Sequence, residues 1–135
     1  QRNVHLEEER DLFTQLGIHY KYMKIQDSID ANILPFINPG IDTIKRSKNN
    51  ILVHCTAGVS RSVSIVVAYL MKEKGMSYLN AIEYVQKRRP IAGPNPSFVY
   101  QLKGLKIWCL NSKFEYVNYT YYYSLGHLNH SQIWF

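Results

Sequence analysis

The chain has 135 residues, 46% of them hydrophobic, which suits one globular domain with its own core. It contains no apolar run near the roughly 20 residues of a membrane span, and its polar, acidic N-terminal residues are not typical of a secretory signal. The formal net charge of +6 favours anionic partners, but the basic clusters at 45–48 and 87–89 are short and typical of solvated helix ends, so no nucleic-acid partner is expected.

The first half of the chain predicts a helix, a strand and a helical region. Residues 7–16 predict a short helix that ends at Gly17, a residue suited to the left-handed position after a helix. Residues 19–25 are aromatic-rich and partly alternate between apolar and polar, which predicts a strand. Residues 33–48 have helical spacing, but Asn38-Pro39-Gly40 leaves open whether one helix or two shorter ones form. The expected inward face consists of Ile33, Phe36, Ile37, Ile41 and Ile44.

The second half predicts one strand and three helices. Ile51–His54 are a short apolar run, expected to be a buried strand. The helices are expected at 62–74, from Ser77 to about residue 89, and from Asn95 to about residue 109. The residues expected to face inward are Val63, Val66, Val67, Leu70 and Met71 in the first helix, and Leu79, Ile82 and Val85 in the second. Strands followed by a helical half indicate an α/β class.

The two cysteines, Cys55 and Cys109, are too few for a disulfide framework. They favour a reduced cytoplasmic or nuclear setting, in which the Asn-x-Ser/Thr triplets at Asn118 and Asn129 are chance matches. The first residue is not Met, so processing or truncation upstream is expected. No metal and no cofactor are expected, because the following histidines lack ligand-like spacing with cysteine: His5, His19, His127 and His130.

The segment from His54 to Ser62 joins the second predicted strand to the next helix. Ligands of open α/β sheets bind at such a place, where the helix N-terminus offers free N–H groups and partial positive charge. Gly58 lets the loop curl, and the five residues between Cys55 and Arg61 suit a loop wrapped around one phosphate. Arg61 can hold two phosphate oxygens at once. The expected phosphate-binding residues are Thr56, Ala57, Gly58, Val59, Ser60 and Arg61.

Cys55 is the predicted nucleophile of this loop. We expect the loop and Arg61 to lower the pKa of Cys55 from about 8.5 toward roughly 3.5–7.5, because they stabilise the reactive thiolate. His54 is expected to hold the loop by hydrogen bonds, and the Ser62 hydroxyl to stabilise the sulfur as a leaving group. The alternative is an inert, buried thiol, which the spacing of Cys, Gly and Arg disfavours.

A general acid must protonate the leaving oxygen. Asp27 follows the strand predicted for 19–25 and should lie at the same sheet edge as Cys55, so it is the preferred candidate. Asp30, interpreted as a helix cap, and Asp42, interpreted as a helix-surface residue, stay open. Cys55 would form a cysteinyl phosphate, while Asp27 would protonate the leaving group and then activate water.

Residues 51–71 resemble the dual-specificity protein phosphatases, especially the MAP-kinase-phosphatase-like branch. The loop has the pattern His-Cys-x-x-Gly-x-x-Arg-Ser, and Ala68–Met71 is similar to a tetrapeptide on that branch's next helix. The resemblance to the family's closing helix lies in Arg88-Arg89, Pro94-Asn95, Ser97-Phe98 and Gln101-Leu102. Asp27-Ser28, with Asn32-Ile33 after it, matches the general-acid loop.

The resemblance covers about residues 18–108 and implies an α/β, partial protein-tyrosine-phosphatase-like fold, with central sheet strands and a helical C-terminal half. We therefore expect residues 1–110 to be an N-terminally incomplete catalytic domain, and 111–135 to be a Tyr-rich tail without a family counterpart. The implied activity is hydrolysis of phosphotyrosine and phosphoserine/threonine in proteins, with MAP kinases among the candidate substrates.

Two other functions stay open. The apparent lack of sheet strands favours a catalytically impaired phosphoprotein-binding module of the same fold, whereas the intact Cys55 and Asp27 speak against it. The third candidate is a phosphatase acting on RNA or lipid phosphates. Lipid phosphatases with this loop tend to carry Lys inside it, and the corresponding residues here are uncharged: Thr56, Ala57, Val59 and Ser60.

Overall fold

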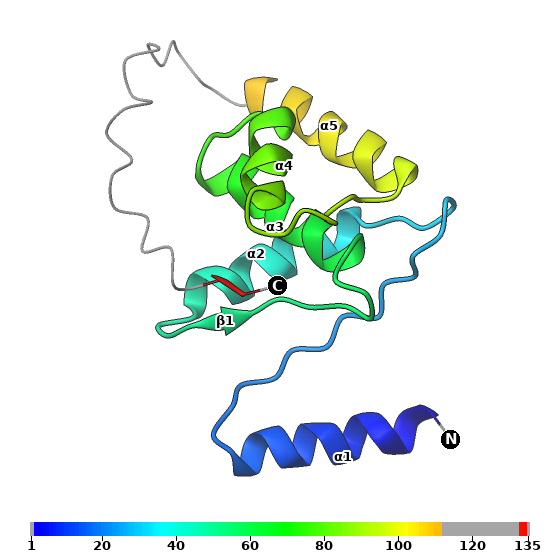
Figure 1. The fold of residues 1–135 in the computed structure, drawn as a ribbon, viewed down its shortest axis with the longest axis vertical. Coiled ribbons are helices and arrows are strands. Elements are labelled where there is room, and N and C mark those ends of the chain that lie inside the picture. The colour runs from blue at the N-terminus through cyan, green and yellow to red at the C-terminus, as the bar shows by residue number, and fades with distance from the viewer. Residues whose placement is uncertain (1, 112–132, 135) are drawn as a thin grey trace.

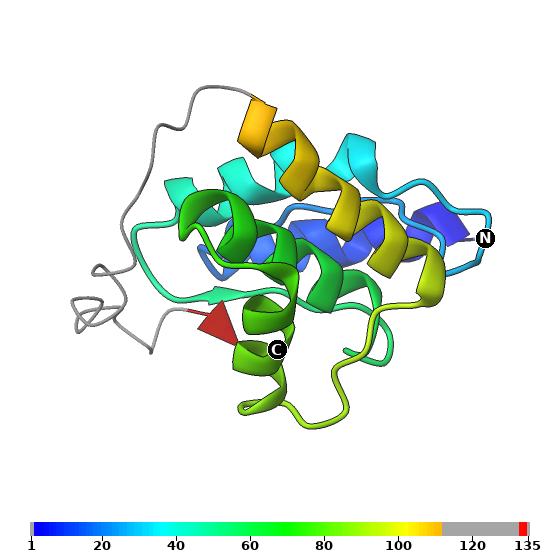
Figure 2. The ribbon, with the colours of Figure 1, turned by 90° about the horizontal axis from the view of Figure 1, so that it is seen from above.

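The computed structural model describes residues 2–111 and 133–134. In chain order the elements are α1 (Arg2–Gln15), α2 (Leu34–Arg46), β1 (Ile51–Leu52), α3 (Arg61–Glu73), α4 (Tyr78–Gln86), α5 (Pro96–Asn111) and β2 (Ile133–Trp134). Helix α3 packs against α2, α4 and α5, and these four helices form the body of the molecule (Figure 1). Helix α1 lies apart from the body in Figure 1 and is overlain by it when seen from above (Figure 2).

Helix α3 occupies the centre because its sequence is apolar on nearly every side. The predicted inward residues Val63, Val66, Val67, Leu70 and Met71 are all buried, which confirms that face. Its remaining sides are covered as well, since neighbouring helices lie on several faces of α3. A helix held from several sides provides a rigid support for the loop that enters its N-terminus at Arg61.

Helix α2 is a single helix, although Pro39 lies inside it. The expected apolar face is formed: Ile37, Ile41 and Ile44 are buried, as is Ile33 just before the helix. Gly40, which by sequence suggests a break, has a packing role instead. A Cβ at Gly40 would lie 2.7 Å from Ile65 Cγ2, so only glycine allows α2 and α3 to approach this closely.

The strand predicted for residues 19–25 is wrong. No residue of this segment is in a strand, because none of the described residues pairs with it. The side chains nevertheless alternate as expected: Met23 and Ile25 pack against the core, while Lys24 between them is exposed. The segment therefore runs along the body as an extended connection, anchored by alternate side chains.

The strand predicted for residues 51–54 is confirmed only over Ile51–Leu52. It pairs in parallel with β2, Ile51 opposite Ile133 and Leu52 opposite Trp134. Leu52 is 60% exposed, contrary to the expected burial, because a two-stranded sheet leaves one of its faces uncovered. The fold is thus mixed α/β with few strands in the described part of the chain.

The predicted helix boundaries are confirmed near α1, α4 and α5, with differences at their ends. Helix α1 begins five residues earlier than expected, at Arg2 instead of residue 7, and is followed by Gly17 at φ +70°. Ser77 caps α4 by accepting a hydrogen bond from Asn80 N, and α4 ends at Gln86 instead of residue 89. No helix of the described residues has the length and apolar character to cross a membrane.

Leu79 was expected to face inward and is 68% exposed. Ala81 and Val85, which are fully buried, define the inward face of α4, and Leu79 lies two residues before Ala81, about 200° around the helix. Ile82 is half-buried beside them. The Tyr-rich tail expected at 111–135 lies outside the described residues, apart from the last residue of α5 and the two residues of β2.

Phe98 of α5 is the largest fully buried side chain in the described part of the chain. Phe98→Ala should lower the free energy of unfolding by about 3–5 kcal/mol, because it removes a buried ring and leaves a cavity. Tyr100→Ala is the matched control on the same helix: Tyr100 is 82% exposed, so the change should stay within about 0.5 kcal/mol. Urea unfolding followed by circular dichroism measures both, and similar losses would contradict the described packing of α5.

Candidate active site

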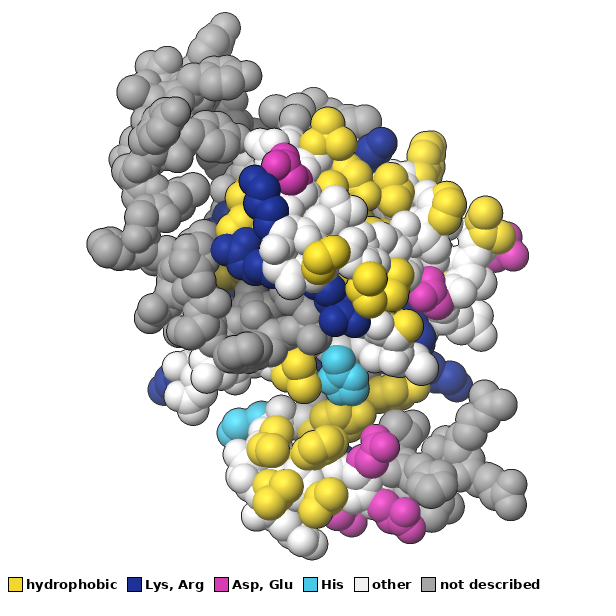
Figure 3. Space-filling model, in the orientation of Figure 1, with side chains coloured by type: hydrophobic (Ala, Val, Ile, Leu, Met, Phe, Trp, Pro, Cys, Tyr) yellow, Lys and Arg dark blue, Asp and Glu magenta, His cyan; other side chains and the backbone are white. Residues whose placement is uncertain are grey.

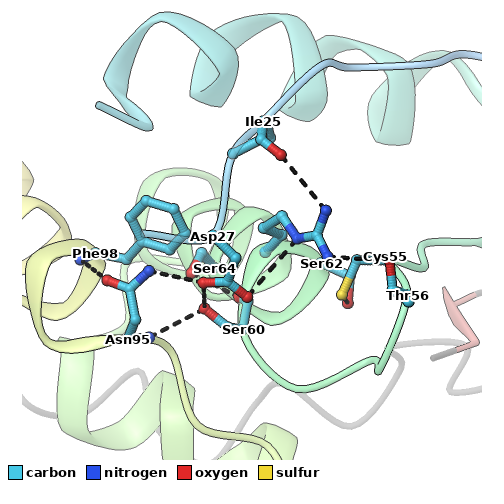
Figure 4. A network of polar contacts seen from close by, with 10 residues as sticks. Ile25, Asp27, Cys55, Thr56, Ser60, Ser62, Ser64, Asn95 and Phe98 are labelled. Carbon is cyan, nitrogen blue, oxygen red and sulfur yellow. Dashed lines mark hydrogen bonds and ion pairs between the residues drawn. The ribbon is translucent and has the colours of Figure 1, made fainter. Parts of the chain in front are cut away.

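The loop from Cys55 to Ser60 connects β1 to the N-terminus of α3. Cys55 Sγ lies 3.3 Å from the Ser62 hydroxyl oxygen in the first turn of α3 (Figure 4). Gly58 has φ +63°, a left-handed conformation that other residues rarely adopt, and it is buried in the loop. The sequence pattern and the strand–loop–helix context therefore bring the sulfur to a helix N-terminus, where an anion is stabilised.

The environment of Cys55 favours its thiolate. Burial of the thiol raises its pKa, but hydrogen bonds to the sulfur outweigh this effect and lower the pKa from 9.0 to about 7. The donors are the Ser62 hydroxyl and the backbone N–H groups of Ser62, Gly58 and Val59. Near neutral pH, about half of the Cys55 side chains are therefore thiolate, the reactive form. The direction agrees with the expectation from sequence, and burial explains why the pKa falls no further.

The Arg61 side chain connects the loop to the extended segment before α2. Arg61 Nη2 donates to the Thr56 hydroxyl at 3.1 Å, and Nη1 donates to the Ile25 carbonyl at 3.5 Å. Arg61 Nε lies 3.7 Å from Asp27 Oδ2 and has no hydrogen-bond partner among the described residues, although it is buried. A buried donor without a hydrogen bond is unfavourable, so this guanidinium is suited to receive an anion.

The Asp27 carboxylate lies at the same loop, as the sequence predicted. Asp27 Oδ1 accepts a hydrogen bond from the Ser60 hydroxyl and another from Asn95 Nδ2, both at 2.7 Å (Figure 4). Oδ1 therefore takes both hydrogen bonds, while Oδ2 faces the Arg61 guanidinium. Among the described residues, no hydrogen bond or ion pair joins Asp30 or Asp42 to the loop. The position of Asp27 was thus predicted, although the strand from which it was inferred is not formed.

Helix α5 positions both the Asp27 segment and the loop. Asn95 caps α5 through Oδ1, which accepts from Phe98 N at 3.0 Å, while its own backbone N–H donates to Ser60 Oγ at 3.0 Å. One turn further on, Gln101 Oε1 accepts from Ile33 N at 2.9 Å, and its Nε2 donates to the Ala31 carbonyl at 2.8 Å. From the sequence, Asn95 was predicted as a helix cap, and both Asn95 and Gln101 lie in the pattern that resembles the family's closing helix, but their contacts with the Asp27 segment were not predicted.

Arg89 holds the outer side of the loop, a role that the sequence analysis missed. Arg89 Nε donates to the Gly58 carbonyl at 2.6 Å, and Nη2 donates to the Ala57 carbonyl at 3.0 Å. The interpretation of residues 87–89 as a solvated helix end is therefore wrong for Arg89. The available signal was the Arg88–Arg89 pair, which belongs to the family pattern.

His54 does not have the loop-holding contacts expected of it. Its side chain is exposed, and no hydrogen bond joins it to another described residue. It follows β1 at a place where the described residues provide only a two-stranded sheet, and none of the described elements covers it. The hydrogen bonds that hold the loop come instead from Arg61 and Asp27 and from residues that follow α4.

Comparisons with known proteins place these features in a family. The family described as "Dual specificity phosphatase, catalytic domain" matches residues 2–106. Dual specificity protein phosphatase 1 of Arabidopsis thaliana is 43% identical over 90 residues, covering 64% of this chain and 46% of that protein. Dual specificity protein phosphatase 5 of Rattus norvegicus is 42% identical over 88 residues, covering 63% and 23%. The chain thus spans less than half the length of these two relatives.

The fold is also similar to solved structures of such proteins. The human tyrosine phosphatase-like serine/threonine/tyrosine-interacting protein superposes with a TM-score of 0.66 at 38% identity, covering 69% of this chain and 64% of that one. The likeness supports a shared fold over the part of the chain that superposes.

Ser62→Ala should raise the pKa of the Cys55 thiol by about one unit from its value of about 7, because a hydrogen bond to a charged group contributes about 1.5 kcal/mol. The rate of iodoacetamide alkylation against pH measures this pKa, in a Cys109→Ser background that leaves Cys55 as the only thiol. Ser64→Ala is the matched control, since Ser64 is buried in the same helix but donates to the Ser60 carbonyl. Equal pKa values in the two variants would contradict the role of the Ser62 hydroxyl.

Proposed function

We propose that this chain, which belongs to the dual specificity phosphatase catalytic domain family, hydrolyses phosphotyrosine and phosphoserine/threonine in proteins through a cysteinyl-phosphate intermediate. The observation that supports this most directly is the Cys55 thiol with a pKa of about 7, in a loop whose N–H groups are directed at the sulfur. The Arg61 guanidinium and the Asp27 carboxylate lie together at the same loop.

In the first proposed step, the Cys55 thiolate attacks phosphorus, and a sulfur–phosphorus bond forms as the phosphorus–oxygen bond of the substrate breaks. Asp27 in its protonated form gives its proton to the leaving alcohol or phenol oxygen. Arg61 and the loop N–H groups stabilise the negative charge on the phosphoryl oxygens.

In the second proposed step, water attacks the phosphorus of the intermediate, and the sulfur–phosphorus bond breaks. The Asp27 carboxylate takes a proton from the attacking water, and the departing Cys55 thiolate receives the hydrogen bond of the Ser62 hydroxyl, which lies 3.3 Å away. Inorganic phosphate is released, and both residues return to their starting protonation states.

Membership of this family supports phosphorylated proteins as the substrate class. Within that class we propose phosphorylated MAP kinases. The net charge of +6 favours such anionic partners, and Lys and Arg side chains lie across the face of the helical body in Figure 3. A cytoplasmic or nuclear location, where such substrates and reduced thiols occur, belongs to the same proposal.

A second candidate function is phosphoprotein binding without turnover. Two observations favour it: the short two-stranded sheet in the described residues, and the likeness to a protein named as phosphatase-like and interacting. The intact Cys55 and Asp27 favour hydrolysis, so the two functions differ in one measurable outcome, the release of phosphate.

Cys55→Ser should abolish hydrolysis of an aryl phosphate, because an uncharged hydroxyl cannot replace the thiolate. Asp27→Asn should slow release of a serine-type alcohol by about 10²-fold or more, and that of an activated nitrophenol much less, since only the poor leaving group needs the proton. Phosphate release at pH 7 measures both.

Asp30→Asn and Asp42→Asn are matched controls, because they replace the same carboxylate by the same amide at two exposed positions. A loss in either control equal to that of Asp27→Asn would assign the general acid elsewhere. Phosphopeptide binding by the folded wild-type chain without phosphate release would favour the binding module.

Turnover compared across substrate classes tests the substrate proposal. Phosphotyrosine and phosphothreonine peptides and a doubly phosphorylated MAP kinase should be hydrolysed faster than phosphoinositide vesicles or 5′-triphosphate RNA, because the uncharged loop residues offer no extra cation to a polyphosphate. Higher kcat/KM on the lipid or the RNA, with activity lost in Cys55→Ser, would replace the protein substrate by that class.

A further inference from the structure

The connection between α4 and α5 binds the outer side of the nucleophile loop by hydrogen bonds. Three successive carbonyl groups of the loop accept hydrogen bonds from this connection. Arg89 donates to the carbonyls of Ala57 and Gly58, at 3.0 and 2.6 Å, and Gly93 N donates to the Val59 carbonyl at 2.9 Å. These carbonyls therefore face away from the sulfur, toward the residues that follow α4.

The geometry of the peptide bond links these outer hydrogen bonds to the orientation of the N–H groups on the inner side of the loop. A peptide bond is planar and trans, so its carbonyl and its N–H point in opposite directions. The Ala57 carbonyl shares a peptide plane with the Gly58 N–H, and the Gly58 carbonyl shares one with the Val59 N–H. Fixing these two carbonyls outward therefore fixes the N–H groups of Gly58 and Val59 inward.

The same two N–H groups are hydrogen-bond donors to the Cys55 sulfur. Both sets of contacts therefore involve the same two peptide planes. Their carbonyls are bound by the Arg89 guanidinium, and their N–H groups point to the Cys55 thiolate. The two sets of contacts are linked through these peptide planes, and without Arg89 the two loop carbonyls would be left to water on this surface.

We propose that Arg89 is a positioning residue of the active site: by holding the Ala57 and Gly58 carbonyls, it turns the N–H groups of Gly58 and Val59 toward the Cys55 sulfur. The inference deepens the proposed function and rests on it for its purpose, because those N–H groups would also stabilise the phosphoryl oxygens. Arg89 acts through the backbone of the loop and does not contact the sulfur.

Gly58 is the second member of this arrangement. A Cβ at Gly58 would lie 2.7 Å from Arg89 Nη2 and 3.1 Å from both Nε and Cζ, and φ is +63°. Glycine is therefore required twice, by the left-handed backbone and by the close approach of the guanidinium. A planar group with several donors suits two neighbouring carbonyls, whereas a lysine ammonium is a compact point charge on a flexible stem.

Arg89→Met should raise the pKa of the Cys55 thiol by about one unit from about 7, because it frees the peptide planes that present two of the donors. Alkylation at pH 7 should then be about fivefold slower, since the thiolate fraction falls from about one half to about one tenth. Iodoacetamide alkylation against pH, in the Cys109→Ser background, measures the pKa without any phosphate substrate. Arg89→Lys should give an intermediate pKa, and Gly58→Ala should raise the pKa as Arg89→Met does.

Arg88→Met is the matched control. Arg88 donates to the Tyr84 carbonyl at 3.0 Å and stacks over the Tyr84 ring at 3.7 Å, so the change removes the same charge one residue away without touching these two carbonyls. Among the described residues, the ionisable groups that face the loop are Arg61, Asp27 and Arg89, with His54 next to Cys55 in sequence. The alkylation curves are repeated in a His54→Gln background, which removes the histidine next to the nucleophile.

A raised Cys55 pKa in Arg89→Met and Gly58→Ala, with an unchanged pKa in Arg88→Met, supports the inference. An unchanged pKa in Arg89→Met, even with a lower melting temperature, overturns it, because a purely structural role would move stability alone. An equal pKa rise in Arg88→Met also overturns it, since charge would then explain the effect. The outcome is independent of turnover: a wild-type chain that shows the shifts but releases no phosphate contradicts the proposed function and leaves the inference standing.

Discussion

The orientation of the peptide planes in the loop after Cys55 is the constraint on which the rest of the site depends. A sulfur at a strand end becomes a thiolate near neutral pH only if several N–H groups face it at once, because burial alone opposes its ionisation. The backbone cannot present its N–H groups inward unless its carbonyls find partners outside. The loop is therefore a two-sided structure, in which Arg89 and Gly93 bind the outer side and Cys55 the inner one.

This requirement explains why the site draws on segments far apart in the chain. Asp27 comes from the extended connection before α2, the loop from the β1–α3 junction, Arg89 from the connection after α4, and Asn95 from the cap of α5. Helix α3 holds these segments together, because α2, α4 and α5 all pack on it. The Asn95 side chain then joins a helix cap to the Asp27 carboxylate, so the geometry of the proposed general acid depends on how α5 docks.

The sheet contributes less than the family pattern implies. In the described residues it consists of two short parallel strands, and the apolar core lies among the helices. The extended segment around Met23 and Ile25 is held by side-chain packing and by the Arg61 contact to the Ile25 carbonyl, without a strand ladder. Stability and site geometry are thus supplied by helix packing and side-chain hydrogen bonds.

The sequence by itself determined the local features of this protein. Helix α3 follows from its apolar residues, the cap of α5 from Asn95-Pro96, and the anion loop from Cys55, Gly58 and Arg61 at fixed spacing, because each depends on neighbours within a few residues. Tertiary structure decided the features that depend on distant partners. Among the described residues, no strand pairs with 19–25, Ile65 packs against Gly40 inside α2, His54 is exposed, and Arg89 binds the loop carbonyls. Pairing and packing involve residues tens of positions apart, and no local pattern records which distant group will satisfy a given carbonyl or cover a given face.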